Sequence, residues 1–359
     1  MRIGIVCPYS LTLPGGVQGQ VLGLAHALRG LGHDVRVLGP CDGPPPDPGV
    51  TPLGDSLPTA ANGSVAPIAP DPAAQLRIIR ALRDERFDVV NVHEPLAPGV
   101  TNTALLFKSQ PLVGTFHAAG ESAAYRWLNP VVRWLASKLD VRCAVSEDAR
   151  AMAAQAVGGT YELVFNGVDI GPYATAAASA TTGGRTILFV GRHEPRKGLA
   201  VLLDAMHHLP GDVVLRVAGE GPETDELRRG VAGDPRIEWL GRISEADKIR
   251  ELAAADVLCA PSLSGESFGV VLLEAMAARA AVVASELPGY ANVARADRDG
   301  LLVPPGDPEA LAGALRRVLD DPALAASLIA SGAERAEGFS MQALAQRYVG
   351  LYEAAIARR

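Results

Sequence analysis

Arg2-Ile3-Gly4-Ile5-Val6, followed by Pro14-Gly15-Gly16 and a helical stretch at 17–30, opens the chain. A short apolar run, a glycine turn and a helical segment are typical of a strand–turn–helix unit. The same order returns at 186–190, which precedes the loop 191–198 and another helical stretch. Such strand–helix alternation indicates parallel sheets covered by helices on both faces. We therefore expect an α/β protein whose halves are both doubly wound.

The predicted strands form two series, and a chain of 359 residues is too long for one compact core. The small and polar stretch 174–184 predicts a linker between two domains. The Pro-rich stretch 41–58 predicts a long loop, and 320–359 is expected to be helical. Strands are predicted at 2–6, 34–38, 88–92, 111–116, 141–145 and 161–165, with helices at 17–30, 72–86 and 147–156, and further strands at 186–190, 213–218, 237–240, 257–260, 281–284 and 301–303.

Composition excludes several classes of protein. Hydrophobic residues make up 48% of the chain, unlike the composition of a disordered protein. The formal net charge of −7 argues against a general nucleic-acid binder, because neutralising phosphates requires a basic surface. Cys7, Cys41, Cys143 and Cys259 form no CxxC signature, so we expect buried, reduced thiols in a cytoplasmic protein. We expect neither a secretory leader nor a membrane span.

The glycine turn at Gly15 and Gly16 follows the first predicted strand. Ligands of doubly wound sheets bind beyond the carboxyl ends of the strands. Glycine lets the backbone approach a phosphate, and the N-terminus of the next helix favours negative charge. Tight turns also use glycine without any ligand, so this feature alone supports both interpretations equally.

The loop Gly191-Arg192-His193-Glu194-Pro195-Arg196-Lys197-Gly198 takes the matching position in the second half. Arg192 offers a fork of donors and Lys197 a point charge, which together suit a diphosphate. The alternative is a solvated charged loop. The position after the first strand of its domain favours phosphate binding.

Two glutamates mark the stretch Ser264-Gly265-Glu266-Ser267-Phe268-Gly269-Val270-Val271-Leu272-Leu273-Glu274. We expect a helix from about Ser267, which places Glu266 at its mouth and Glu274 two turns in, near the same face. Both carboxylates can then accept hydrogen bonds from ligand hydroxyls, while free N–H groups face phosphates. Alternatively, Glu266 complements the helix dipole. Glu274 lies in an apolar run and needs a partner.

Two other motifs allow a functional and a structural interpretation. Thr115-Phe116-His117 ends a predicted strand at its carboxyl edge, where His117 is equally a ligand-facing group or a satisfied structural histidine. Asp297-Arg298-Asp299 has the form of a metal-binding DxD motif, but it lies in a polar stretch before a late strand. We interpret it as a turn and expect no essential metal.

Together these segments resemble the retaining glycosyltransferases of family 4, which have the two-domain fold called GT-B. The most specific marks are the E-x7-E element from Glu266 to Glu274 and the glycine-bounded loop 191–198. The resemblance is closer still to the actinobacterial phosphatidylinositol mannosyltransferases. It rests on Met1 to Ser10, Pro14-Gly15-Gly16-Val17-Gln18, His93-Glu94-Pro95, Thr115-Phe116-His117, Asn166-Gly167-Val168-Asp169 and Gly265 to Gly269.

The resemblance implies two Rossmann-like domains facing a central cleft. Residues 1–169 with 341–359 would bind the acceptor, the last helix crossing back to the first domain, and residues 170–340 would bind the donor. The implied reaction moves a hexose with retention, as mannose from GDP-mannose to phosphatidyl-myo-inositol in glycolipid biosynthesis. No cofactor is implied beyond the nucleotide sugar, and the leaving phosphate would accept the acceptor's proton.

The resemblance also assigns roles to individual residues. Glu266 would hold the hydroxyls of the donor sugar, Glu274 those of the ribose, and His117 would sit beside the reacting sugar. Catalytic roles fall to His117, Arg192, Lys197 and Glu266. Donor binding falls to Gly15, Gly16, Arg192, Lys197, Glu266, Ser267, Phe268, Gly269, Val270 and Glu274, and acceptor binding to Tyr9, Thr12 and His117.

The acceptor side departs from the mannosyltransferase pattern. An acidic residue is expected near position 12 and basic residues near 67 and 122, but the chain has Thr12, Pro67 and Ser122. An inositol phosphate needs cations or strong donors around it. Inositol phosphate itself, a lipid-linked glycan or a natural product therefore stay open as acceptors, and the residues do not distinguish a GDP from a UDP donor.

Two other classes of protein are alternatives to a sugar transferase. A nucleotide-sugar epimerase would need a glycine-rich fingerprint for a bound oxidised cofactor, which the chain lacks. A non-catalytic protein that binds a sugar nucleotide would have the same acidic and basic residues. Only a demonstrated transferase activity excludes this class.

Arg77, Arg80 and Arg83 fall on one side of the predicted helix 72–86. A basic amphipathic helix can lie on an anionic membrane, here the inner face of the plasma membrane, although an ordinary surface helix packed on its sheet has the same pattern. The sequence predicts no oligomeric state.

Overall fold

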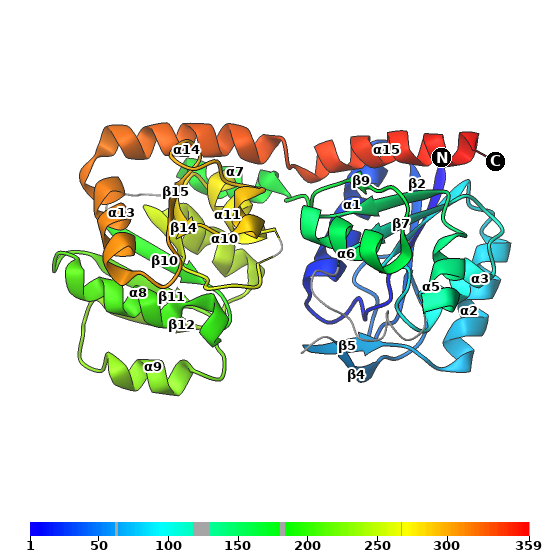
Figure 1. Ribbon diagram of the computed structural model, residues 1–359, viewed down its shortest axis with the longest axis horizontal. Helices are drawn as coiled ribbons and strands as arrows, with labels where there is room; N and C mark the ends of the chain where they lie inside the picture. Colours follow the sequence, from blue (N-terminus) through cyan, green and yellow to red (C-terminus); the bar gives the residue numbers. More distant parts are fainter. Residues whose placement is uncertain (62–63, 118–128, 180–183, 267, 359) are drawn as a thin grey trace. The chain divides into compact units, whose positions relative to one another are not determined.

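The computed structural model describes residues 1–61, 64–117, 129–179, 184–266 and 268–358. The chain divides into two compact units, Met1–Gly167 with Met341–Arg359, and Val168–Ser340 (Figure 1). This division lies two residues before the expected boundary at 169, and the final helix belongs to the first unit.

A parallel sheet of seven strands forms the first unit, in the order β3-β2-β1-β6-β7-β8-β9. The strand order reverses between β1 and β6, which is where doubly wound sheets leave room for a ligand. The strands are β1 (Arg2–Val6), β2 (Asp34–Gly39), β3 (Val50–Pro52), β6 (Val89–His93), β7 (Leu112–Phe116), β8 (Val141–Ala144) and β9 (Glu162–Leu163), and a separate antiparallel hairpin joins β4 (Leu57–Ala61) to β5 (Ser64–Ile68).

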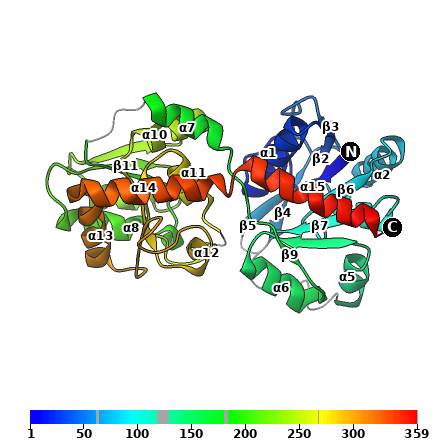
Figure 2. The same ribbon diagram turned by 90° about the horizontal axis from the view of Figure 1, so that it is seen from above.

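Two helical layers cover this sheet. Ile3 and Ile5 of β1 pack with α1 (Gly16–Gly30) and α15 (Met341–Ala357), which lie side by side (Figure 2). Val6 packs on the other side, with α2 (Pro72–Asp84) and α3 (Val100–Leu106). This alternation follows the pleat of the strand. The remaining helices of the unit among the described residues are α5 (Asn129–Ala136) and α6 (Glu147–Val157).

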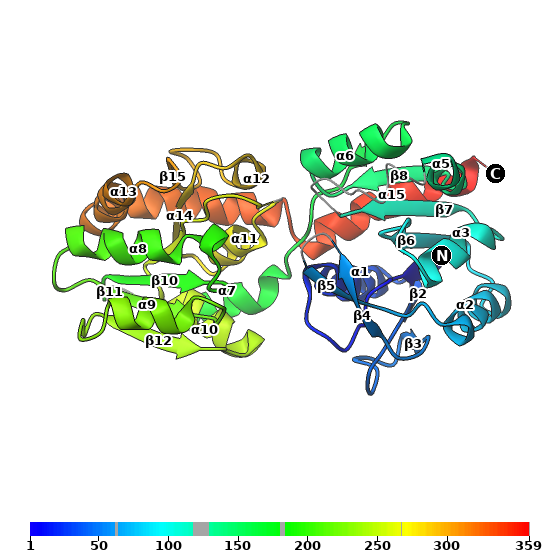
Figure 3. The same cartoon turned by 60° about the horizontal axis from the view of Figure 1, so that its bottom comes forward.

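The second unit contains a parallel sheet of six strands in the order β12-β11-β10-β13-β14-β15. Figure 3 shows β10, β11 and β12 side by side. Its order reverses between β10 and β13. The strands are β10 (Thr186–Val190), β11 (Val214–Ala218), β12 (Ile237–Gly241), β13 (Val257–Ala260), β14 (Ala281–Ser285) and β15 (Leu301–Val303). The helices are α7 (Ile170–Ser179), η1 (Pro195–Lys197), α8 (Leu199–Ala205), η2 (Met206–His208), α9 (Thr224–Gly230), α10 (Glu245–Ala254), α11 (Val270–Ala277), α12 (Pro288–Ala291), α13 (Pro308–Asp320) and α14 (Pro322–Glu337).

The predicted α/β class and the two parallel sheets are confirmed, but three segments differ from expectation. The stretch 320–359, expected to be helical throughout, is broken at 338–340, because α14 ends at Glu337 and α15 begins at Met341. The predicted linker at 174–184 is wrong over its first part, because α7 continues to Ser179; its alanines are the strongest helix formers. The predicted loop 41–58 is interrupted by β3, which pairs with β2, and β4 begins at Leu57. Pro52 is tolerated because β3 is an edge strand.

All four cysteines are buried and free, as predicted. Within the described ranges, no helix is both long and apolar enough to cross a membrane.

Candidate active site

The carboxyl ends of β10 and β13 bring the two predicted donor segments together. The strands are parallel neighbours at the reversal of strand order, so the loops that follow them share one edge of the sheet. A backbone hydrogen bond of 2.7 Å from Leu263 N to Arg196 O joins the two loops. The predicted residues Lys197 and Glu266 therefore meet, although 69 positions separate them.

Glu266 accepts hydrogen bonds from both loops. Its Oε1 lies 2.5 Å from Lys197 Nζ, 3.1 Å from Ser262 Oγ and 3.4 Å from Arg196 Nη1. Ser262 Oγ lies 2.9 Å from the buried hydroxyl of Tyr290. Burial raises the pKa of Tyr290, and the Glu266 carboxylate raises it further. The Glu266 carboxylate is thus held between two cations on one loop and the hydroxyl of Ser262, which is hydrogen-bonded to that of Tyr290.

A second glutamate, Glu194, extends this arrangement. Its Oε1 lies 2.7 Å from Arg192 Nη2, and its Oε2 lies 3.0 Å from Arg196 Nε. Cations and carboxylates therefore alternate in the order Arg192, Glu194, Arg196, Glu266 and Lys197, which we call the donor cluster. It carries one positive charge in excess, and Arg192, with 67% of its side chain exposed, is free to meet an anion.

Glycines allow the backbone to approach closely at two points of this site. Gly198 has φ of +68°, and a Cβ there would overlap the carbonyl oxygen of Pro261. Gly269 has φ of +89°, and a Cβ there would lie 2.6 Å from Cδ1 of Tyr290. At both positions only glycine adopts the left-handed backbone conformation at low cost and leaves room for the neighbouring atom.

The expected helix start at Ser267 is wrong, and Ser267 itself lies outside the described residues. Helix α11 begins at Val270, preceded by Gly269 in the left-handed conformation. Glu266 therefore lies in the loop before the helix and does not share a helical face with Glu274. The ring of Phe268 is buried and packs edge-to-face on Phe339, with centroids 5.7 Å apart.

Glu274 has the partner that its apolar surroundings require. Its Oε1 lies 2.8 Å from Nζ of Lys248, which also lies 2.9 Å from Oε1 of Glu245. The hydroxyl of Tyr173 donates to Glu245 at 3.0 Å. Burial alone would lower the pKa of Lys248, but the Glu274 carboxylate, followed by Glu245, raises it overall. The lysine therefore stays charged, and Glu274 keeps lone pairs for a second donor.

In the first unit, the glycine turn lies at the corresponding reversal of strand order. Gly15 is extended and caps α1, which begins at Gly16. A Cβ at Gly15 would overlap the side chain of Gln18, whereas one at Gly16 would meet no atom within 4 Å. Of the predicted acceptor residues, Thr12 accepts from Asp42 N at 2.9 Å, and Tyr9 forms a backbone bridge with Ile68.

His117 follows β7 and contacts His93, which entered the sequence analysis only within the motif His93-Glu94-Pro95 and without a role. Its Nε2 lies 2.8 Å from Nδ1 of His93, and the two rings stack with centroids 5.0 Å apart. Its backbone N–H donates to Glu94 Oε1 at 2.8 Å. Burial lowers the pKa of His117 to about 4, so the ring is neutral near pH 7.

The three arginines predicted to meet a membrane are not equivalent. Arg77 Nη1 donates to the carbonyl oxygen of Leu53 at 2.9 Å and so supports the fold. The side chains of Arg80 and Arg83 are 81% and 71% exposed, and both lie within 4 Å of Asp84. The basic face of α2 therefore has two exposed cations with one shared counter-charge.

The DxD-like motif forms a turn, as predicted. Asp297 has φ of +55°, and Asp299 accepts from Arg295 and Ser331. Over the described ranges, no group of three or more His, Cys, Asp or Glu side chains is arranged to hold a metal ion.

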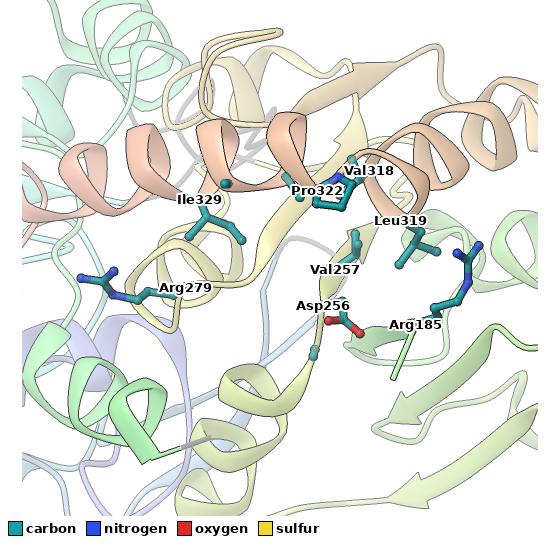
Figure 4. A pocket seen from close by; sticks show the side chains of 11 residues that line it. Arg185, Asp256, Val257, Arg279, Val318, Leu319, Pro322 and Ile329 are labelled. Atoms are coloured by element: carbon teal, nitrogen blue, oxygen red, sulfur yellow. The ribbon is translucent and has the colours of Figure 1, made fainter. Parts of the chain in front are cut away.

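A cavity of about 340 Å³ lies at the other edge of the second sheet (Figure 4). Asp256 and Val257 at the start of β13, with Arg185 and Arg279, line one side, and α13 and α14 supply an apolar wall. None of the predicted site residues lines it; Lys197 and Glu266 meet at the carboxyl edge.

Sequence reasoning missed Glu194, Arg196, Ser262, Lys248 and His93. Glu194 and Arg196 stand in the predicted phosphate loop, so their charge and position were a usable signal. Lys248 stands 26 residues before Glu274 on another helix, and no local pattern links the two.

Comparison with known proteins identifies the family of the chain. Residues 14–171 match the model of "Glycosyltransferase Family 4", and residues 184–321 match that of "Glycosyl transferases group 1". The chain is 41% identical to the phosphatidyl-myo-inositol mannosyltransferase of Mycobacterium leprae over 98% of this chain and 96% of that protein. It is 40% identical to the protein of the same name from Mycolicibacterium smegmatis, with 98% and 94% covered.

Solved structures show the same fold at lower identity. Anabaena HepE in complex with UDP has a TM-score of 0.75 at 20% identity and covers 99% of this chain and 100% of its own. A glycosyltransferase from Rickettsia africae has a TM-score of 0.76 at 17% identity, with 99% and 98% covered.

Proposed function

Because the chain belongs to the family 4 glycosyltransferases, we propose that it transfers mannose from GDP-mannose to phosphatidyl-myo-inositol with retention of configuration. The observation that carries this proposal is the donor cluster at the carboxyl ends of β10 and β13. The names of the mycobacterial relatives support the sugar and the acceptor. A solved complex of HepE with UDP-glucose supports a nucleotide sugar as donor.

Donor binding would exchange the partners inside the donor cluster. Diphosphate oxygens replace the carboxylates beside Arg192 and Lys197, and these cations then stabilise the charge that develops on the leaving diphosphate. Glu266, released from Lys197, accepts hydrogen bonds from the mannose hydroxyls. Glu274 keeps its contact with Lys248 and accepts from the ribose hydroxyls through its remaining lone pairs.

The proposed transfer takes place on one face of the sugar. The bond between the anomeric carbon and the diphosphate oxygen breaks, and the acceptor hydroxyl oxygen bonds to the same face. Its proton passes to the leaving diphosphate. His117 contacts the transferred sugar as a neutral ring, in agreement with its low pKa. The first unit would bind the acceptor and the second unit the donor.

A different acceptor is the second candidate, and the acceptor side of the first unit favours it. Thr12 and Pro67 replace an acidic and a basic residue of the mannosyltransferase pattern, and Ser122, which replaces another basic residue, lies outside the described residues. Thr12 is occupied by Asp42 N, and the carbonyl oxygen of Pro67 accepts from Ser10 N at 2.9 Å. Neither position offers a cation to an inositol phosphate.

One set of parallel reactions separates these candidates. The protein is incubated with GDP-mannose and vesicles containing phosphatidylinositol, and the lipids are analysed by mass spectrometry. Parallel reactions contain UDP-glucose, inositol phosphate or a lipid-linked glycan. Mannosylated phosphatidylinositol is the expected product. Transfer to another acceptor would reject the lipid but keep the donor half, and no released nucleotide from any donor would favour a non-catalytic binding protein.

A lipid acceptor requires contact with a membrane surface, and we assign that contact to Arg80 and Arg83. Binding to anionic vesicles should weaken with salt and in the Arg80→Gln/Arg83→Gln variant. Arg229→Gln, which removes an arginine of the second unit, is the control. Binding that is equal in all three proteins would remove α2 from the account.

A further inference from the structure

The histidine pair of the first unit is the outer end of a buried polar network. His93 is 2% exposed, and its Nδ1 faces His117 Nε2. Its other ring nitrogen, Nε2, lies 3.3 Å from Nδ2 of Asn91, two residues earlier on β6. Asn91 is completely buried. Two successive hydrogen bonds therefore connect the ring of His117 to the interior of the sheet.

The amide of Asn91 is oriented by β7 and by the C-terminal helix. Its Nδ2 donates to the hydroxyl of Tyr352 at 3.0 Å, and its Oδ1 accepts from Thr115 Oγ1 at 3.0 Å. Thr115 Oγ1 also lies 3.0 Å from the hydroxyl of Tyr348. Thr115 has one hydrogen and gives it to Asn91, so it accepts from Tyr348. In this orientation the amide oxygen faces Thr115, and the amide nitrogen faces Tyr352 and His93.

Donor and acceptor roles then follow along the network. An amide nitrogen can only donate, so Nε2 of His93 must accept from Asn91. A neutral imidazole has one hydrogen, which in His93 must lie on Nδ1. This N–H donates to Nε2 of His117 at 2.8 Å, so the hydrogen of His117 lies on its Nδ1.

The assignment of hydrogens requires the rings of His93 and His117 to be neutral, and both are. Burial lowers the pKa of His93 well below its usual range, and His117 lowers it further. Burial also lowers the pKa of His117 to about 4. Protonating His117 on Nε2 would place two N–H groups against each other, unless His93 moved its hydrogen to the nitrogen that Asn91 faces.

We propose that Asn91 is a positioning residue, held by Thr115 and Tyr352, which fixes His117 as a neutral ring with its hydrogen on Nδ1. Such a ring presents an N–H donor to an oxygen of the transferred sugar or of its phosphate, and it has no lone pair at Nδ1 to act as a base. The inference rests on the proposed function only where it assigns His117 to the sugar. The tautomer itself is a property of the free protein.

Nitrogen NMR on the full chain with labelled histidines tests the tautomer without substrate. The chain has seven histidines, so the two signals are assigned with His93→Gln and His117→Gln. The expected spectrum shows His117 with a bare Nε2 and a protonated Nδ1. A hydrogen on Nε2 of His117 in the wild-type protein would overturn the proposal.

Substitutions test whether Asn91 imposes that state. In Asn91→Leu nothing requires Nε2 of His93 to accept, so both tautomers of His117 should appear. With the two forms equally populated, kcat/KM for the donor should fall about twofold, and in general by the same factor as the Nδ1–H fraction. A single Nδ1–H tautomer with the wild-type kcat/KM in Asn91→Leu would contradict the proposal.

A matched pair at Thr115 keeps the test decisive if Asn91→Leu does not fold. Thr115→Val removes the hydrogen that orients the amide and should also give mixed tautomers, whereas Thr115→Ser should restore the wild-type spectrum and kcat/KM. Identical spectra for the two variants would reject the network. If the predicted tautomer is found but no mannose is transferred to any acceptor, the proposed function fails and the network stands.

Discussion

Lys197 Nζ donates to Glu266 Oε1 at 2.5 Å, and this contact joins the loops after two neighbouring strands of the second unit. The two groups are only 22% and 11% exposed, so they are held in place and partly shielded from water. A diphosphate oxygen can replace Glu266 as the partner of Lys197, and a sugar hydroxyl can replace Lys197 as the partner of Glu266. The contact therefore marks the point where we expect the donor to enter.

Lys197→Ala should reduce transfer strongly. Loss of a preorganised cation at a leaving diphosphate should lower kcat/KM by about 10²- to 10³-fold. Steady-state transfer of mannose measures this effect. Arg298→Ala, which removes an exposed arginine of the same unit, is the control and should keep full activity. Equal activity in both variants would remove Lys197 from the mechanism.

Lys248→Met should destabilise the second unit. It leaves the Glu274 carboxylate buried without its cation, which costs about 3 kcal/mol or more in the free energy of unfolding. Urea unfolding measures the loss. The double variant Lys248→Met/Glu274→Gln should recover part of it, because no uncompensated charge is left. A single variant as stable as the wild type would show that the pair is not coupled.

Gly198→Ala should destabilise the same unit for a different reason. Alanine pays for the left-handed conformation, about 1 to 2 kcal/mol, and its Cβ also overlaps Pro261 O. Gly211→Ala is the matched control, since a Cβ there meets nothing within 4 Å. Thermal unfolding of both variants should show a loss only for Gly198→Ala. Similar losses in the two would contradict the close approach.

Acid should destabilise the first unit through His117. The folded pKa is about 4 and lies below the ordinary value of 6.5, so between these values the unfolded chain binds the proton that the folded protein does not. Stability is therefore present above pH 6.5 and is lost as the pH falls, by about 2 kcal/mol between pH 7 and pH 5. Urea unfolding of His117→Gln should show a shallower pH dependence than the wild type. His26→Gln, at an exposed histidine, should match the wild type.

The sequence predicted those parts of the fold that local patterns determine. Apolar runs such as 186–190 predicted strands. The glycine turn at Gly15 predicted the helix that follows the first strand. The pattern failed where small residues have two meanings: the alanines at 174–179 suggested a linker but form α7. The short strand β3 was missed because it depends on pairing with β2.

The site was predictable to the extent that single loops define it. Arg192 and Lys197 were predicted because they follow the first strand of their domain, and Glu266 because it stands just before a predicted helix. The ion pair of Lys248 with Glu274 and the contact between His93 and His117 were not, because both join elements distant in sequence. Such contacts follow from strand order, which the alternation of elements leaves undetermined.

A structure of the protein with GDP-mannose bound tests the central claim most directly. The account predicts that Lys197 Nζ lies at hydrogen-bond distance, about 3 Å, from a diphosphate oxygen, with Arg192 beside the same group and Glu266 on a mannose hydroxyl. A diphosphate bound away from Arg192 and Lys197, with the Lys197–Glu266 contact intact, would contradict it.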